Sequence, residues 1–167
     1  IYLYDTYGFD IFSKNITEAY ANQFRGMRVD SGDNFEQLRK ICKLYADKRI
    51  DSRTKQITFS NALNVDRAIQ IQKVASKVCL PNFGIGGHFT NDWDGICPMN
   101  IVIKLVAIAD NESWGFLADT CKLSEDKGKH TGVVDVVNRF MSQLPQFAEE
   151  LKKQPKMAQS IIAAAQA

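Results

Sequence analysis

The sequence lacks several features that would place it in a specialised class. It has only two histidines, and no apolar run reaches the roughly 18 residues needed to span a bilayer. The formal net charge is only +2, so we expect neither a nucleic acid nor a membrane as a partner. What remains is 45% hydrophobic and 24% charged residues in a chain of 167, the composition of a globular domain with its own core.

Cysteine is also scarce and is not spaced for a cluster. The four cysteines are Cys42, Cys79, Cys97 and Cys121. They form no C-x-x-C pair, and His88 and His130 lie too far apart to complete a zinc site or a catalytic triad. We therefore expect reduced, buried thiols in a cytoplasmic protein, and no cluster of metal-ligating side chains.

The two ends of the sequence differ in character. The chain opens on the apolar run Ile1–Tyr4, without a methionine and without the features of a targeting segment. Because domains rarely begin inside a buried strand, we expect this to be the later part of a longer polypeptide. Residues 145–167 are rich in Ala, Lys and Gln and contain Pro155, which predicts a helical tail after an α/β domain over residues 1–144.

One pattern occurs four times in the first half of the chain. A short apolar or β-branched run ends at a small polar residue or a glycine, and a helical pattern follows. The runs end at Asp5, Asp30, Asn61 and Gly86, about one βα unit apart. Successive βα units predict parallel strands in a doubly wound sheet or a barrel, with ligands at the carboxyl ends of the strands. We therefore expect these four positions to converge on one site.

Helical patterns follow the first three runs. The first helix is expected over residues 9–24. The second is expected after Asp33, a candidate N-cap, and the third after Asn64. The residues expected on their apolar faces are Phe35, Leu38, Cys42 and Tyr45 in the second helix, and Val65, Ala68, Ile69 and Val74 in the third.

The pattern changes after Pro98. Residues 100–109 form an apolar strand that we expect to pair with residues 113–124 as a β-hairpin, and a helix is expected from Val133. Lys104 interrupts this strand and is expected to point outward.

Three glycines follow the fourth apolar run, and they raise the question of a phosphate site. Bare backbone N–H groups at Gly84, Gly86 and Gly87 could approach a phosphate, and a helix capped by Thr90 or Asn91 would add a favourable dipole. The stretch is neither a Walker motif nor a complete GxGxxG. A structural turn explains the same residues, so both interpretations stay open.

Charged residues crowd the end of the second apolar run. Arg28, Asp30 and Asp33 could bind a sugar diol, a magnesium ion and a phosphate oxygen. The alternative is an Arg–Asp salt bridge with Asp33 as a helix cap. Asp5 likewise either faces a site or caps the helix that follows it.

A polar loop near the end of the domain offers a further candidate. It carries Ser124, Lys127 and Lys129 and contains a glycine, so that it could close over anions. A solvated loop explains the same residues.

Taken together, four stretches resemble the nicotinate phosphoribosyltransferase family. They are GMRVDSGD (26–33), FGIGGHFTND (83–92), PMNIVIKL (98–105) and KLSEDKGK (122–129), and LYDTYGFDIF (3–12) is a fifth segment similar to the family. Each stretch alone is weak, but the ordered set is specific. The similarity covers roughly residues 1–140 and corresponds to the later part of the family's chain.

The resemblance implies a fold and an activity. The fold is part of an irregular α/β barrel of the type II phosphoribosyltransferase kind, with βα units followed by a β-hairpin and C-terminal helices. The activity is the condensation of nicotinate with 5-phosphoribosyl-1-pyrophosphate, coupled to ATP hydrolysis and assisted by Mg²⁺, to give nicotinate mononucleotide in NAD salvage. Type II relatives often dimerise, so the resemblance also allows a homodimer.

The resemblance also assigns roles to residues. Asp30 and Arg28 would be catalytic, and Gly86 and Gly87 would hold the 5′-phosphate. Other expected substrate-binding residues are Asp5, Ser31, Gly32, Asp33, Asn61, Gly84 and His88.

The sequence departs from the family in ways that leave alternatives open. Asn61 and Asn64 stand where the family commonly has acidic residues, and Gly87 stands where it usually has Thr. The histidine that ATP phosphorylates and most of the nicotinate pocket would lie outside this sequence, so we expect the isolated chain to be inactive. The alternatives are a nicotinamide-using phosphoribosyltransferase and a non-catalytic relative that binds a nucleotide or phosphate.

Overall fold

A computed structural model describes residues 1–91, 93–96, 101, 103–109, 116–124 and 129–144. The chain divides into two compact units, Ile1–Ile101 and Val102–Ala167. The predicted helical tail at 145–167 lies outside the described residues and stays a prediction.

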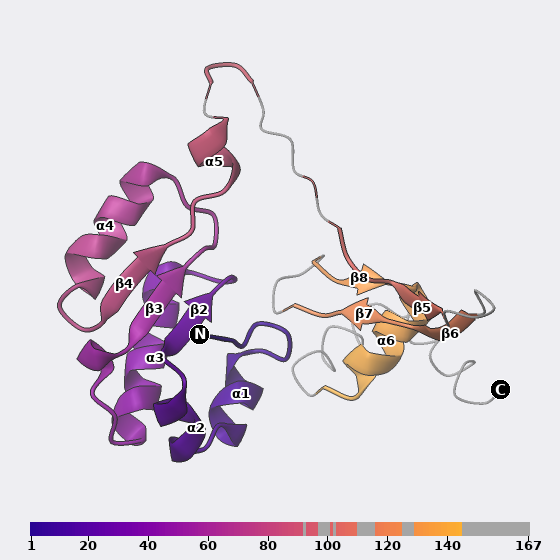
Figure 1. Ribbon diagram of the computed structural model, residues 1–167, viewed down its shortest axis with the longest axis horizontal. Helices are drawn as coiled ribbons and strands as arrows, with labels where there is room; N and C mark the ends of the chain where they lie inside the picture. The colour runs from indigo at the N-terminus through magenta and orange to yellow at the C-terminus, as the bar shows by residue number, and fades with distance from the viewer. Residues whose placement is uncertain (92, 97–100, 102, 110–115, 125–128, 145–167) are drawn as a thin grey trace. The chain divides into compact units, whose positions relative to one another are not determined.

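The first unit is built on a parallel sheet. Its strands are β1 (Tyr2–Leu3), β2 (Gly26–Val29), β3 (Gln56–Phe59) and β4 (Leu80–Phe83), hydrogen-bonded in that order and all parallel (Figure 1). The predicted α/β class with parallel strands is therefore confirmed. The predicted barrel is not: within the described residues the four strands form an open sheet.

Helices connect the strands, and the first connection differs from the prediction. The expected single helix over 9–24 is two helices, α1 (Phe9–Asn15) and α2 (Glu18–Gln23). Ile16 is extended at the break, and the Thr17 side chain accepts a hydrogen bond from the backbone N–H of Tyr20. Threonine competes for backbone groups in this way, so it begins a new helix more readily than it continues one.

The second and third helices begin where the caps predicted. α3 (Asn34–Asp47) is capped by Asp33, whose carboxylate accepts from two backbone N–H groups at the helix start. α4 (Val65–Ala75) is capped by Asn64. Between them a 3₁₀ turn, η1 (Ser52–Thr54), leads into β3.

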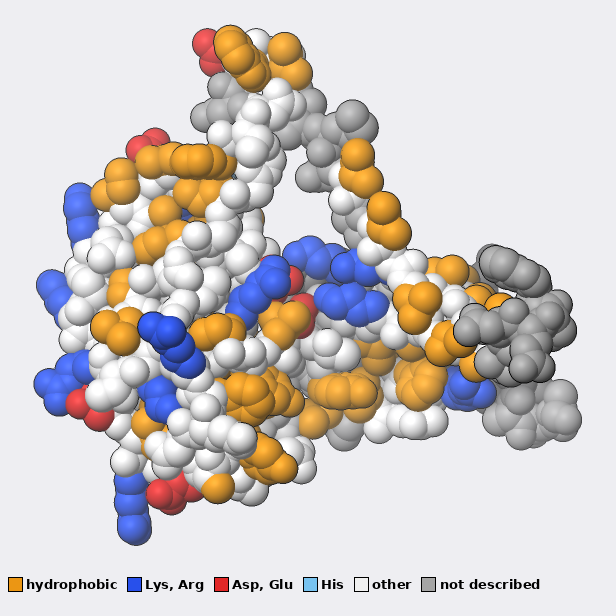
Figure 2. All heavy atoms as spheres, viewed as in Figure 1, with side chains coloured by type: hydrophobic (Ala, Val, Ile, Leu, Met, Phe, Trp, Pro, Cys, Tyr) orange, Lys and Arg blue, Asp and Glu red, His pale blue; other side chains and the backbone are white. Residues whose placement is uncertain are grey.

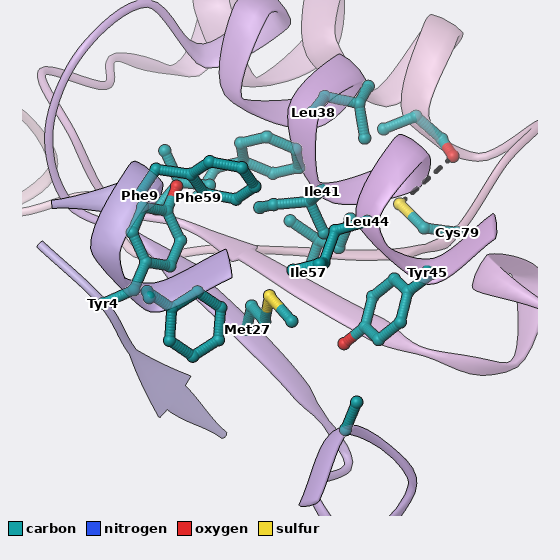
Figure 3. Close-up of a cluster of buried hydrophobic side chains, with 14 of the residues drawn as sticks. Tyr4, Phe9, Met27, Leu38, Ile41, Leu44, Tyr45, Ile57, Phe59 and Cys79 are labelled. Carbon is teal, nitrogen blue, oxygen red and sulfur yellow. Dashed lines mark hydrogen bonds between the residues drawn. The ribbon is translucent and has the colours of Figure 1, made fainter. Parts of the chain in front are cut away.

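The core lies between the sheet and these helices. α3 contacts β2, α4 contacts β4, and the two helices contact each other, so they cover the same face of the sheet. Figure 3 shows the buried side chains gathered there, with the dashed line joining the thiol of Cys79 to the Ala75 carbonyl. The labelled members are Tyr4, Phe9, Met27, Leu38, Ile41, Leu44, Tyr45, Ile57, Phe59 and Cys79.

The apolar face expected for α4 is largely wrong. Val65, Ile69 and Val74 are about half exposed, and hydrophobic side chains are visible over α4 in Figure 2. The buried residues are Ala68, Ile71 and Ala75. The buried stripe therefore runs through Ala68, Ile71 and Ala75, so of the four expected residues only Ala68 is confirmed.

A buried lysine ties the start of β3 to the end of α2. Lys55 is 7% exposed, and its ammonium group donates three hydrogen bonds of 2.9 Å, to the carbonyl oxygens of Ala21, Asn22 and Phe24. The last carbonyls of a helix have no partner inside the helix and carry partial negative charge. Lys55 therefore satisfies one helix end with all three of its donors.

Two buried side chains that titrate at high pH, Tyr45 and Cys79, predict a loss of stability in alkaline solution. Burial raises the pKa of Tyr45 to about 12, with smaller contributions from the Cys42 and Cys79 thiols, and burial also raises the pKa of Cys79 to about 12. Between pH 9 and 12 the unfolded chain loses protons that the folded chain keeps. The free energy of unfolding should therefore be unaffected below about pH 9. Above it, Cys79 should lower the free energy of unfolding by roughly 1 kcal/mol per pH unit, and Tyr45, whose ordinary pKa is 10.0, should add a similar fall from about pH 10.

Urea unfolding of the chain between pH 7 and 11 measures this fall. Tyr45→Phe should make it shallower without loss at pH 7, because the buried Tyr45 hydroxyl has no hydrogen-bond partner among the described residues. Tyr20→Phe is the matched control, since Tyr20 is 59% exposed. A free energy of unfolding that stays level from pH 9 to 11 would contradict the prediction.

The second unit contains two antiparallel strand pairs and a helix. β5 (Ala107–Ala109) pairs with β6 (Phe116–Asp119), so the expected pairing is present, but only at the end of the strand expected over residues 100–109, because residues 103–106 are not in a strand. β7 (Cys121–Lys122) pairs with β8 (Thr131–Gly132), and α6 (Val134–Ser142) follows as expected from Val133. Lys104 is exposed, but its neighbours Ile103 and Leu105 are exposed as well and none of them is in a strand, so the expected orientation on a strand is not tested.

Two further features of the described part of the chain are the distribution of positive charge over the first unit and the length of the helices. Lysine and arginine side chains are scattered over the visible face of the first unit in Figure 2. Among the described residues, no helix is long and apolar enough to cross a membrane.

Candidate functional site

The carboxyl ends of the four parallel strands meet at one edge of the sheet. Val29 of β2, Phe59 of β3 and Phe83 of β4 are paired in register, and Leu3 of β1 pairs with Arg28. The hydrogen-bond ladder continues one residue further, since the Ser60 N–H donates to Val29 and the Gly84 N–H donates to Phe59. The residues that follow the strand ends therefore form one row across the sheet: Asp5, Asp30, Ser60 and Gly84. Asp5 and Asp30 are in this row as expected, whereas the other two expected run ends, Asn61 and Gly86, lie one and two residues beyond it.

Arg28, Asp30 and Ser60 form a polar cluster in this row. Nη2 of Arg28 donates to Oδ1 of Asp30 over 2.8 Å, and Nε of Arg28 donates to Oγ of Ser60 over 2.8 Å. The Ser60 hydroxyl lies 2.7 Å from the same Oδ1 and 3.0 Å from the Val29 carbonyl oxygen. Within the described part of the chain, Oδ2 of Asp30 and Nη1 of Arg28 make no hydrogen bond, so both can meet a ligand.

Asn61 connects the loop that follows β3 to the loop that follows β2. Its side-chain amide donates to the carbonyl oxygen of Gly32 over 2.8 Å, and the side chain of Asn34 donates to the carbonyl oxygen of Asn61 over 3.2 Å. Gly32 has a φ of 70°, and a Cβ there would lie 2.8 Å from the side-chain nitrogen of Gln37. The loop that carries Asp30 is thus held from the end of β3, and glycine is required for its turn.

Asp33 is turned toward the helices. Besides capping α3, it forms an ion pair of 3.2 Å with Arg67, and the Arg67 guanidinium lies 4.7 Å from the centre of the Phe35 ring. Both elements of the structural alternative, the Arg28–Asp30 salt bridge and the Asp33 cap, are therefore present. The structural alternative does not account for Oδ2 of Asp30 and Nη1 of Arg28, which make no hydrogen bond to the described residues.

Asp5 and Ser31 lie at the edge but are buried. Asp5 is 2% exposed and Ser31 is 0% exposed, so neither side chain can contact a ligand at the protein surface. The alternative that Asp5 caps the first helix is wrong, because the N-cap of α1 is Gly8.

The glycine loop begins at the same edge and leads into one turn of helix, α5 (Gly87–Thr90). Gly86 is its N-cap and Thr90 its last residue, so the expected cap at Thr90 or Asn91 is wrong. A Cβ on Gly86 would meet no atom within 4 Å, and His88 is exposed. The backbone at Gly86 and Gly87 is therefore open to an approaching group.

The polar loop of the second unit is described only in part. Ser124 is buried, and its backbone N–H lies 3.4 Å from Nδ1 of His130. Lys127 lies outside the described residues, so closure of this loop over an anion stays a prediction. Across the described ranges, no group of His, Cys, Asp and Glu is arranged to hold a metal ion.

The geometry adds residues that the sequence did not single out. Ser60 is the link between Arg28 and Asp30, and Arg67 binds Asp33. The signal for Ser60 was its place at the end of a repeated run, directly before Asn61. The edge as a whole presents a carboxylate oxygen, a guanidinium edge and bare backbone, a set that suits a phosphorylated sugar.

These features define an α/β protein with a polar site at the carboxyl edge of a parallel sheet. The model of the nicotinate phosphoribosyltransferase (NAPRTase) family matches residues 1–140. The chain therefore belongs to the nicotinate phosphoribosyltransferase family.

Individual relatives agree with this assignment. A nicotinate phosphoribosyltransferase of Desulforapulum autotrophicum is 40% identical over 134 residues, which cover 79% of this chain and 33% of the relative. A probable nicotinate phosphoribosyltransferase of Schizosaccharomyces pombe is 37% identical, with 86% and 36% covered. The crystal structure of nicotinate phosphoribosyltransferase from Porphyromonas gingivalis matches with a TM-score of 0.72 and 37% identity, with 85% and 36% covered. The chain thus spans about a third of the length of these relatives.

Proposed function

We propose that this chain supplies the phosphoribosyl-binding part of an enzyme that joins nicotinate to 5-phosphoribosyl-1-pyrophosphate, giving nicotinate mononucleotide and pyrophosphate. The observation that carries the proposal is the Arg28–Asp30–Ser60 cluster at the carboxyl edge of the sheet. One carboxylate oxygen and one guanidinium edge are left there for a ligand that has hydroxyls and phosphate oxygens.

The reaction gives each group a task. The bond from C1 of the ribose to pyrophosphate breaks with its electron pair on the pyrophosphate oxygen, and the pyridine nitrogen of nicotinate donates its lone pair to C1. Positive charge develops on the sugar ring between these events, as in glycoside cleavage. Oδ2 of Asp30 would hold the ring hydroxyls and stabilise that charge, while Nη1 of Arg28 would bind a phosphate oxygen.

The glycine loop would hold the 5′-phosphate. Open backbone at Gly86 and Gly87 permits N–H groups to approach phosphate oxygens more closely than side chains would allow. Because α5 has only four residues, we assign this binding to the individual N–H groups and not to a helix dipole.

Magnesium would arrive with the pyrophosphate. Magnesium sites commonly use one or two protein carboxylates together with substrate phosphates. Asp30 and Asp5 at this edge would supply these carboxylates. When bound, the ion would neutralise charge on the leaving pyrophosphate. ATP coupling, implied by the resemblance, would depend on residues outside this sequence.

A row of polar side chains on the second face of the sheet supports a barrel. Arg28, Thr58 and Asn82 are paired across β2, β3 and β4, on the face opposite the buried Met27, Val29, Ile57 and Phe59. A polar row on that face suits the inside of a barrel that further strands would close, with the candidate site at its mouth.

A chimeric enzyme tests the proposal. The segment of the D. autotrophicum relative that matches this chain is replaced by residues 1–140, and labelled nicotinate is supplied with phosphoribosyl pyrophosphate, magnesium and ATP. We expect nicotinate mononucleotide from the chimeric enzyme and none from the isolated chain. Product from the isolated chain would contradict the expectation that it is inactive, and an inactive chimeric enzyme would contradict the proposed function.

A second candidate is a relative that binds a nucleotide without catalysis. The observation in its favour is the neutral Asn61, whose amide is used on Gly32 and adds no charge to the edge. Calorimetric titration of the chimeric enzyme with nicotinate mononucleotide separates the two candidates, because binding without turnover supports the second.

A further inference from the structure

We infer that Ser60 is a positioning residue of this site, whose hydroxyl fixes the Arg28–Asp30 pair in the one orientation that faces a ligand. The inference rests on the proposed function and deepens it by adding a residue that touches no substrate itself.

The hydrogen bonds around Ser60 form a closed ring. Nε and Nη2 lie on one edge of the Arg28 guanidinium; the first donates to Ser60 Oγ and the second to Asp30 Oδ1, both over 2.8 Å. Ser60 Oγ closes the ring, because it lies 2.7 Å from the same Oδ1 and can donate its single proton to it. This edge of the guanidinium is thus satisfied within the protein, and the opposite edge with Nη1 makes no hydrogen bond to the described residues.

The pair could not hold this geometry alone. The side chains of Arg28 and Asp30 are 43% and 28% exposed, and an ion pair with that exposure contributes about 0–1 kcal/mol and leaves long side chains free to reorient. The Ser60 hydroxyl adds a contact to each member of the pair. The backbone of Ser60 is itself held by a hydrogen bond of 2.9 Å from its N–H to the Val29 carbonyl oxygen.

Ser60→Ala and Ser60→Thr separate positioning from folding. Alanine removes the acceptor for Nε and the donor to Oδ1, whereas threonine keeps the hydroxyl. The first measurement is the NMR order parameter of the Arg28 Nε–H group in the 167-residue chain. We expect a value near ~0.85 in the wild type and in Ser60→Thr, and below ~0.6 in Ser60→Ala.

The second measurement uses the chimeric enzyme. Ser60→Ala should lower kcat/KM for phosphoribosyl pyrophosphate by about 10-fold to 100-fold, the effect of about one or two hydrogen bonds to a charged group. The KM for nicotinate should stay within twofold, because the base does not contact this cluster in the proposal. Ser60→Thr should restore most of the loss.

Ser52→Ala is the matched control. The Ser52 hydroxyl donates to the backbone carbonyl of Val78 over 2.7 Å and touches neither Arg28 nor Asp30, and Ser52 precedes β3 while Ser60 follows it. Its loss should alter thermal stability as much as Ser60→Ala does, with no change in Arg28 order or in kcat/KM.

The outcomes distinguish the inference from the function beneath it. An active chimeric enzyme whose Ser60→Ala variant matches the wild type, or an Arg28 side chain equally ordered in both, overturns the positioning role alone. A wild-type chimeric enzyme without turnover overturns the proposed function and the inference with it.

Discussion

Gly26→Ala is expected to unfold a large fraction of the chain. Gly26 pairs with Gln56 where β2 and β3 begin, and a Cβ at this position would overlap the backbone carbonyl oxygen of Gln56. Backbone on both sides of the contact is fixed by the sheet, so the overlap can be relieved only by separating the strands. We expect a loss of about 3 kcal/mol or more, a large part of the 5–15 kcal/mol that typically stabilises a domain.

Urea unfolding followed by circular dichroism measures this loss, and Gly84→Ala is the control. A Cβ at Gly84 would lie 3.3 Å from the Cβ of Ser60, a tight contact with a side chain and not an overlap with backbone. Its cost should stay near ~1 kcal/mol. Equal midpoints for the two variants would show that close approach at Gly26 is not what holds β2 against β3.

Asp30→Asn is expected to lower kcat of the chimeric enzyme about 10²-fold to 10³-fold, the range found when one group that stabilises transition-state charge is removed. The amide keeps the size of the side chain but removes the negative charge that faces the developing charge on the sugar. The fold should change little, because the Arg28–Asp30 pair is partly exposed.

Single-turnover measurement with saturating phosphoribosyl pyrophosphate isolates the chemical step. Asp47→Asn is the matched control: Asp47 is also paired with a cation, Lys43, but stands at the last residue of α3. Its kcat should equal that of the wild type. If Asp30→Asn turns over as fast as Asp47→Asn, Asp30 has no part in the chemistry.

The caps of α3 and α4 and the end of β2 were predictable because short-range chemistry decides them. Asp33 and Asn64 cap α3 and α4 as expected, and the second run ends at Asp30, directly after β2, whereas the third was expected to end at Asn61, two residues after the end of β3. A β-branched run followed by a polar residue has few other structures available to it, whatever the rest of the chain does.

The errors fall where tertiary packing decides. The periodicity of α4 favoured Val65, Ile69 and Val74, but the buried stripe runs through Ala68, Ile71 and Ala75. Lys55 looks like any surface lysine in the sequence, because its three acceptors lie 31 to 34 residues earlier. Ser60 has the same character: a serine is common at a strand end, and its role appears only when the register brings it between Arg28 and Asp30.

The hydrogen bonds of Lys55 also set an order of events during synthesis. The carbonyls that it binds belong to residues that leave the ribosome more than 30 residues before it does. Until Lys55 emerges, the end of α2 has only water to satisfy those carbonyls, and helices this short are marginal in water. The first 24 residues should therefore dock only after β3 has been translated, which makes this segment a place where a nascent-chain chaperone could bind.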